Sequence, residues 1–199
     1  LWMIFLFSID SELHAKNYRP NDVIDGKFNL NKKFELNLPE GKWIVVNARQ
    51  ESYYGLFSKL YSLVKLENNA AVEWIQIAEM HTAGIYEDIV NQAIYEAIFK
   101  NKYDGCYERP EYYVVEVYKK GSTHNCFRVG HVDVHKDFYS PDDPEVSNTE
   151  LTKWVRDNNI ELPKVGLDSF HAYFSRLAAG KWYLLQYGID PKILNAPKN

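Results

Sequence analysis

The stretch KFNLNKKFELNLPEGKWIVVNA, residues 27–48, decides the fold class of this protein. Its first half places apolar side chains at even positions only: Phe28, Leu30, Phe34, Leu36 and Leu38. Strict alternation over this length predicts a strand with one apolar and one solvated face. Leu38-Pro39-Glu40-Gly41 is typical of a turn, because proline presets φ and glycine tolerates a positive φ. With residues 42–48 as the return strand, the stretch predicts a β-hairpin over 27–48.

Similar signals predict three more hairpins, formed by 56–68 with 71–80, by 111–118 with 125–135, and by 169–177 with 182–189. The Asn68-Asn69 pair marks the turn of the first of these. In the second, apolar residues change from odd to even positions at Gly130, which predicts a β-bulge there. Glycine-rich phosphate loops and βαβ units are missing from the sequence, which argues against a doubly wound nucleotide-binding fold.

Two segments have helical periodicity. Residues 82–101 repeat apolar side chains every three and four positions, and Thr149 can cap a shorter helix over 149–159. The proline-containing stretch 140–148 is a loop before this C-terminal helix-hairpin segment. The chain is therefore expected to be α+β and mainly antiparallel β: a hairpin-built sheet, or a partly closed barrel or sandwich, with two helices.

The N-terminus resembles the end of a secretory signal peptide. LWMIFLFSI carries no charge, and SELHA offers a small-residue cleavage site after Ala15. A basic start is missing and the chain begins at Leu1, so we expect a signal peptide over 1–15 that has lost its first residues. The alternatives are a buried strand or the end of a membrane anchor. Residues 16–199 are then a single β-rich domain, periplasmic or secreted, with no membrane span in the mature chain.

Charge excludes several classes of partner. The net charge is −4, and lysines and arginines occur at most in isolated pairs such as Lys32-Lys33. A nucleic-acid binder needs a clustered basic footprint, and so does a domain held electrostatically at a membrane surface. We therefore expect neither nucleic acid nor an anionic membrane surface as the partner.

The two cysteines, Cys106 and Cys126, both lie in the expected mature domain. An even cysteine count in an exported protein predicts a disulfide, whereas a cytosolic location would leave two free thiols. The bond would close a loop of roughly 20 residues, worth about 3 kcal/mol in the chain-entropy model.

HVDVH, residues 131–135, is the main candidate for chemistry. In a strand, His131, Asp133 and His135 point to one face and could ligate a metal. Alternate residues lie about 7 Å apart along a strand, so sharing an ion requires a bent strand. Polar residues at alternate positions are also the default of an amphipathic strand, and we favour a solvated face. Cys126, two residues from His124, is a weaker candidate nucleophile, because no nucleophile signature surrounds it.

Aromatic residues and carboxylates provide further candidates. Tyr112 and Tyr113 belong to a tyrosine-rich hairpin, and flat rings can stack on sugars or line an apolar pocket. Cross-strand packing is the simpler interpretation of such rings. Glu73 and Glu79 are a potential carboxylate pair, but their separation in space cannot be read from the sequence.

One short motif carries a family resemblance. FELNLPEGKW, residues 34–43, resembles the LPxGxW strand–turn–strand pattern of an uncharacterised family of exported bacterial proteins. The resemblance covers the first hairpin. It implies an exported β-rich protein and transfers no active site.

The sequence favours an exported β-rich domain in the cell envelope that binds a small ligand or a protein partner. We lean against an enzyme and expect no cofactor. One alternative is a metal-binding protein or metal-dependent enzyme that uses His131, Asp133 and His135. Another is a structural subunit of an envelope complex, because hairpins create exposed sheet edges.

Overall fold

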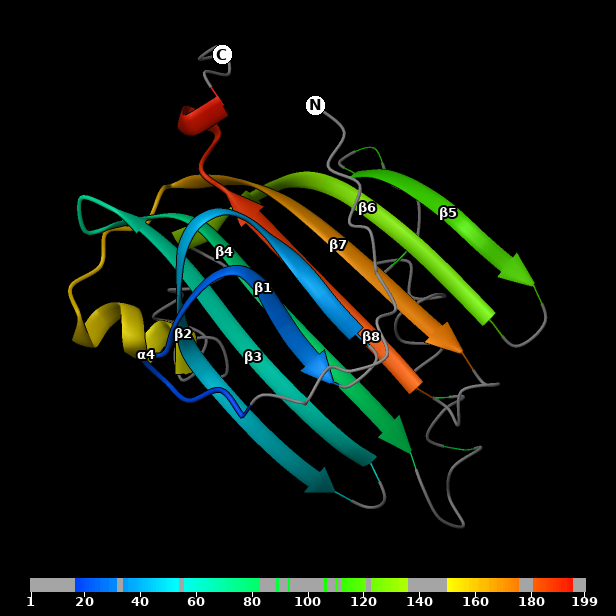
Figure 1. Cartoon of the computed structure of the whole chain (residues 1–199). Coiled ribbons are helices and arrows are strands. Elements are labelled where there is room, and N and C mark those ends of the chain that lie inside the picture. Colours follow the sequence, from blue (N-terminus) through cyan, green and yellow to red (C-terminus); the bar gives the residue numbers. More distant parts are fainter. Residues whose placement is uncertain are drawn as a thin grey trace.

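The protein is described here by a computed structural model, which contains one antiparallel sheet. The described residues are 17–31, 34–53, 56–82, 89, 93, 106, 110, 112–120, 123–135, 150–175 and 181–194. The sheet has eight strands in the order β1-β2-β3-β4-β8-β7-β6-β5 (Figure 1). The elements are β1 (Val23–Asn31), β2 (Phe34–Tyr53), β3 (Leu56–Glu67), β4 (Ala70–Thr82), β5 (Tyr112–Lys120), β6 (Thr123–Asp133), α4 (Glu150–Asp157), β7 (Val165–Ser175), β8 (Lys181–Ile189) and η3 (Pro191–Leu194).

The β-rich class and the hairpin organisation are confirmed. Strands β3 and β4 meet at Asn68 and Asn69, whose φ angles of 51° and 65° are the positive values that a tight hairpin turn requires. The sheet is open, with β1 and β5 at its two ends, so closure into a barrel is not found in this part of the chain. None of the described helices is both long and apolar enough to cross a membrane.

The predicted turn at 38–41 is wrong. The chain reverses between Asn31 and Phe34 instead, and Phe34 N–H donates a 3.1 Å hydrogen bond to Asn31 Oδ1. The sequence concealed this turn because the pairing matches even residues with even residues, as in Phe28 with Leu36. The apolar alternation therefore continues in phase through the reversal, as if one strand continued.

Residues 38–41 form a bend inside β2. Asp25 pairs with Lys42 and Lys27 pairs with Asn37, so four residues of β2 lie opposite Gly26 alone. Gly26 and Gly41 have φ angles of 78° and 114°, which side chains other than glycine rarely adopt. The bend carries β1 and the first part of β2 over the face of the central strands (Figure 1).

The main core lies between this β1–β2 hairpin and the sheet. Its largest fully buried members are Trp43 and Phe28. The cluster also takes side chains from β2, β3, β4 and β8, among them Val45, Leu63, Ile75, Ile77, Tyr183 and Leu185. Burial of these apolar side chains holds the hairpin against the sheet.

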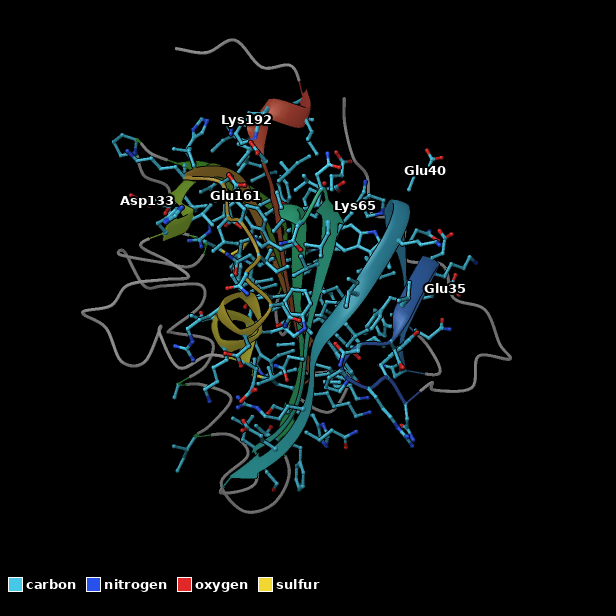
Figure 2. The ribbon with its side chains drawn as sticks, turned by 90° about the vertical axis from the view of Figure 1, so that its left-hand side faces the viewer. Glu35, Glu40, Lys65, Asp133, Glu161 and Lys192 are labelled. Carbon is cyan, nitrogen blue, oxygen red and sulfur yellow. A yellow bond between two sulfur atoms is a disulfide. The ribbon has the colours of Figure 1, made fainter. Side chains whose placement is uncertain are left out.

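Helix α4 covers the opposite face of the sheet (Figure 2). Leu151 and Val155, one turn apart, pack with Val64 and Trp74. The helix predicted over 149–159 is confirmed with bounds Glu150–Asp157, and its expected cap Thr149 lies outside the described residues. The sheet is thus sandwiched between a strand layer and a single described helix.

Several predictions concern residues that lie outside the described part of the chain. The helix expected over 82–101 lies outside the described residues, apart from Thr82 at the end of β4 and the helical Ile89 and Ala93. The leader 1–15 and the loop 140–148 also lie outside them.

The bulge expected at Gly130 is wrong, because β6 pairs with β7 without a shift from Thr123 to Asp133. Phe127 and Val129 are half-buried on the second face, and this produced the apparent change of phase.

Candidate functional site

The HVDVH segment lies at the end of β6 and faces solvent. His131, Asp133 and His135 are all exposed, whereas Val134 between them is buried. The described residues contain no group of three or more His, Cys, Asp or Glu side chains placed to hold a metal ion. The metal hypothesis therefore has no geometric support from this part of the chain.

Cys106 and Cys126 form a disulfide, as predicted, with their Cα atoms 6.1 Å apart. Both side chains are buried and pack with Ala172 and Trp182. The sulfur of Cys126 is engaged in this bond, so the nucleophile hypothesis is wrong.

The two tyrosines of β5 lie on opposite faces of that strand. Arg128 lies over the ring of Tyr112, 4.8 Å from its centroid, and at the same distance over Phe170. Tyr112 therefore has a packing role. Tyr113 is 64% exposed, which leaves its ring accessible, and its predicted ligand contact stays a prediction.

Two lysine–glutamate–tyrosine clusters lie on one face of strands β3, β4 and β8. The arch cluster, beside the bend of β2, consists of Lys65, Glu73 and Tyr187. The tip cluster lies beneath the tip of the β1–β2 hairpin and consists of Lys59, Glu79, Tyr183, Lys181 and Asn31. The glutamates are six residues apart on β4, which corresponds to about 20 Å along the strand.

The arch cluster is saturated. Lys65 Nζ lies 2.6 Å from Glu73 Oε1, and Tyr187 OH donates a 2.5 Å hydrogen bond to Glu73 Oε2. Burial, followed by the neighbouring Glu73 carboxylate, raises the pKa of Tyr187, so its hydroxyl remains a donor. Gly41 lies directly against Lys65, and a Cβ there would come within 2.9 Å of Lys65 Cε. Both carboxylate oxygens have partners in this compact arrangement.

In the tip cluster, the lysines and the tyrosine lie farther from the Glu79 carboxylate than their counterparts in the arch cluster lie from Glu73. Asn31 Nδ2 donates a 2.9 Å hydrogen bond to Glu79 Oε1, and Tyr183 OH lies 3.5 Å from the same oxygen. Lys59 Nζ is 3.9 Å from Oε2 and Lys181 Nζ is 3.8 Å from Oε1. Glu79 Oε2 is buried, and it receives no hydrogen bond from the described residues. A carboxylate that is only 5% exposed is thus incompletely coordinated.

Aromatic rings extend the tip cluster. Phe34, next to the hairpin tip, packs on Tyr183 with ring centroids 4.3 Å apart. Tyr173, the cross-strand partner of Tyr183, lies with its ring centroid 6.2 Å from that of Tyr183. Phe34 and Tyr173 are half-buried, so part of each ring reaches the surface. Burial, followed by the Glu79 charge, raises the pKa of Tyr183 and keeps its hydroxyl protonated.

A second polar pair continues the same face. His171 Nε2 lies 2.5 Å from Asn125 Oδ1, and the Phe127 ring meets the imidazole edge-on at 6.4 Å. Burial lowers the pKa of His171 below its ordinary value of 6.5. Asn125 pairs with Tyr173 and Tyr173 with Tyr183, so these side chains continue the row that starts at Glu79.

Sequence reasoning missed both clusters, although a signal was present. Glu73 and Glu79 are in phase with the buried Ile75 and Ile77, so two charges interrupt an apolar stripe. A buried carboxylate needs partners, and that requirement could have directed attention to β4. The partners on β3 and β8 could not be assigned without the strand order.

Comparisons of the chain with protein-family models, with curated proteins and with solved structures found no match.

Proposed function

We propose that this protein is an exported, non-enzymatic β-rich domain that binds a small polar ligand at the tip cluster. The observation that carries the proposal is the buried Glu79 Oε2, which has no hydrogen-bond donor among the described residues. A buried acceptor without a hydrogen-bond donor is costly, and a ligand group that donates to it would remove that cost. The matched Glu73 carboxylate, on the same strand, has no such deficit.

The supporting framework is rigid. Glu79 and Tyr183 belong to the central strands β4 and β8, and their backbones pair directly. Side chains held on strands keep their geometry better than side chains on loops. Lys59 and Lys181 are 35% and 39% exposed, so their long side chains can move aside to admit a ligand without any change in the sheet.

Export is part of the proposal. A disulfide is typical of oxidising compartments, and Cys106–Cys126 is compatible with a periplasmic or secreted location. The apolar run LWMIFLFSI and the small-residue site that ends at Ala15 also support export.

The test is a thermal-shift screen of the full chain against small sugars, amino acids, polyamines and carboxylic acids. We expect at least one compound to raise the unfolding temperature saturably, because a ligand that binds only the folded state stabilises it. Glu79→Gln should abolish that shift. Glu73→Gln is the matched control and should retain it. A shift that survives Glu79→Gln unchanged, or a screen without any saturable shift, contradicts the proposal.

A further inference from the structure

The charge balance of the tip cluster restricts the ligand. One carboxylate, Glu79, lies between the ammonium groups of Lys59 and Lys181, at 3.9 and 3.8 Å. A cationic ligand would be attracted by Glu79 but repelled by two lysines. An anionic ligand would have to approach the buried carboxylate. A neutral ligand that both donates and accepts hydrogen bonds avoids both penalties, since it can donate to Glu79 Oε2 and accept from the lysines.

The surrounding rings favour a ligand with flat apolar faces. Tyr183 is flanked by Phe34 and Tyr173, and both ring pairs are tilted at 34°. Aromatic faces of this kind pack against the C–H surfaces of sugar rings. Beyond Tyr173, the amide of Asn125 adds a further polar group on the same face.

The row is long enough for more than one sugar ring. Lys59, Glu79, Tyr183, Tyr173 and Asn125 are successive cross-strand partners on β3, β4, β8, β7 and β6. Four strand spacings correspond to about 19 Å. The half-buried members of the row, Tyr173 and Asn125, would hold the accessible end of the ligand.

From these features we infer that the ligand is a neutral oligosaccharide, with one hydroxyl donating to Glu79 Oε2 and one ring stacked on Tyr173. The inference rests on the proposed function, because it names the class of ligand for the same site. A neutral sugar supplies hydroxyl donors, hydroxyl acceptors and apolar ring faces together, which amino acids and polyamines do not.

The experiment is titration calorimetry of the full chain with maltotriose, cellotriose and chitotriose. Spermidine serves as the cationic comparison and citrate as the anionic one. We expect saturable binding of at least one trisaccharide and none of the charged compounds. Glu79→Gln and Tyr173→Ala should each weaken binding at least tenfold. Glu73→Gln, at the matched carboxylate, should leave the affinity within twofold of the wild type.

The outcomes separate the two proposals. If spermidine or citrate binds in a Glu79-dependent manner and no trisaccharide does, the ligand class is wrong and the binding site stands. If none of the three trisaccharides binds, the oligosaccharide inference is overturned, whereas the proposed function is judged by the outcome of the thermal-shift screen. If a trisaccharide binds equally well to Glu79→Gln and Tyr173→Ala, sugar binding lies elsewhere and the assignment to the tip cluster is wrong. Should either variant fail to fold, Lys181→Met, at an exposed side chain of the same cluster, replaces it.

Discussion

The arch cluster and the tip cluster use the same three residue types on the same three strands, yet they differ in coordination. At the arch, a lysine and a tyrosine each contact one oxygen of Glu73 at 2.6 and 2.5 Å. At the tip, the lysine and tyrosine lie 3.9 and 3.5 Å from Glu79, and an asparagine makes the shortest contact. The difference teaches that residue composition alone does not identify a site. A saturated carboxylate stabilises the fold, whereas an undersaturated one is available to a ligand.

The largest expected effect separates the two glutamates. Glu73→Gln should lower the free energy of unfolding by about 2 kcal/mol, because it removes the charge that pairs with Lys65 and accepts from Tyr187. Glu79→Gln should change it by less than about 1 kcal/mol or raise it, since a poorly coordinated buried charge disappears. Urea unfolding of the two variants measures the difference. Equal losses would remove the distinction between the clusters.

A double-mutant cycle sharpens the comparison. Lys65→Met combined with Glu73→Gln should give a coupling energy of about 1–2 kcal/mol, because the pair is close and mostly buried. Lys59→Met combined with Glu79→Gln should give less than about 0.5 kcal/mol, since Lys59 is more than one-third exposed and 3.9 Å away. Urea unfolding of the wild type, the two single variants and the double variant supplies the four free energies of each cycle. A larger coupling energy at the tip cluster than at the arch cluster would show that the tip, and not the arch, stabilises the fold.

The arch can also be disturbed through its backbone. Gly41→Ala should cost about 1–2 kcal/mol, because φ is 114° and the new Cβ would meet the Lys65 side chain. Gly26→Ala is the matched control, with φ of 78° and open space around the Cβ, and it should cost about 1 kcal/mol from backbone strain alone. Thermal unfolding of the two variants compares them. A smaller loss for Gly41→Ala than for Gly26→Ala would show that Lys65 yields freely and that the arch is not tightly packed.

The smallest effect is a pH dependence beside the tip cluster. The pKa of His171 is lowered by burial, so the unfolded chain takes up its proton first as the pH falls below 6.5. Stability should therefore be complete above pH 6.5 and decline on acidification. In the arch cluster the pKa of Tyr187 is raised, so its hydroxyl stays protonated throughout this pH range. His171→Gln should reduce the fall in unfolding temperature between pH 7.5 and pH 5.0, measured by calorimetry. If the unfolding temperature of the variant falls as much as that of the wild type, His171 does not contribute to the pH dependence of stability.

The extent of sequence prediction differs between elements. The Asn68-Asn69 hairpin and α4 were predicted because local signals, two turn residues and a buried helical stripe, agree with the final fold. The first hairpin was predicted with its turn at the wrong place. Its reversal at Asn31–Phe34 keeps the parity of the apolar residues, whereas Pro39 and Gly41 give a strong turn signal within a bent strand.

The candidate site was predicted less well than the fold. HVDVH attracted attention because its three polar side chains fall on one face of a strand, but at the end of β6 these side chains lie in solvent. Glu79 was noted only as a possible partner of Glu73, which lies about 20 Å away along β4. Its partners come from positions 31, 59, 181 and 183, and a sequence pattern cannot bring such distant segments together.

The sequence by itself determined the antiparallel β-rich class, the disulfide partners and the absence of a basic footprint, because alternation, cysteine count and charge are local or compositional properties. Only the tertiary structure decided that β4 pairs with β8, that the β1–β2 hairpin folds across the sheet, and that Glu73 is satisfied while Glu79 is not. Those features depend on strand order and on differences of about 1 Å in the distances between side chains far apart in the chain. They follow from packing the whole core at once, and no single segment encodes them.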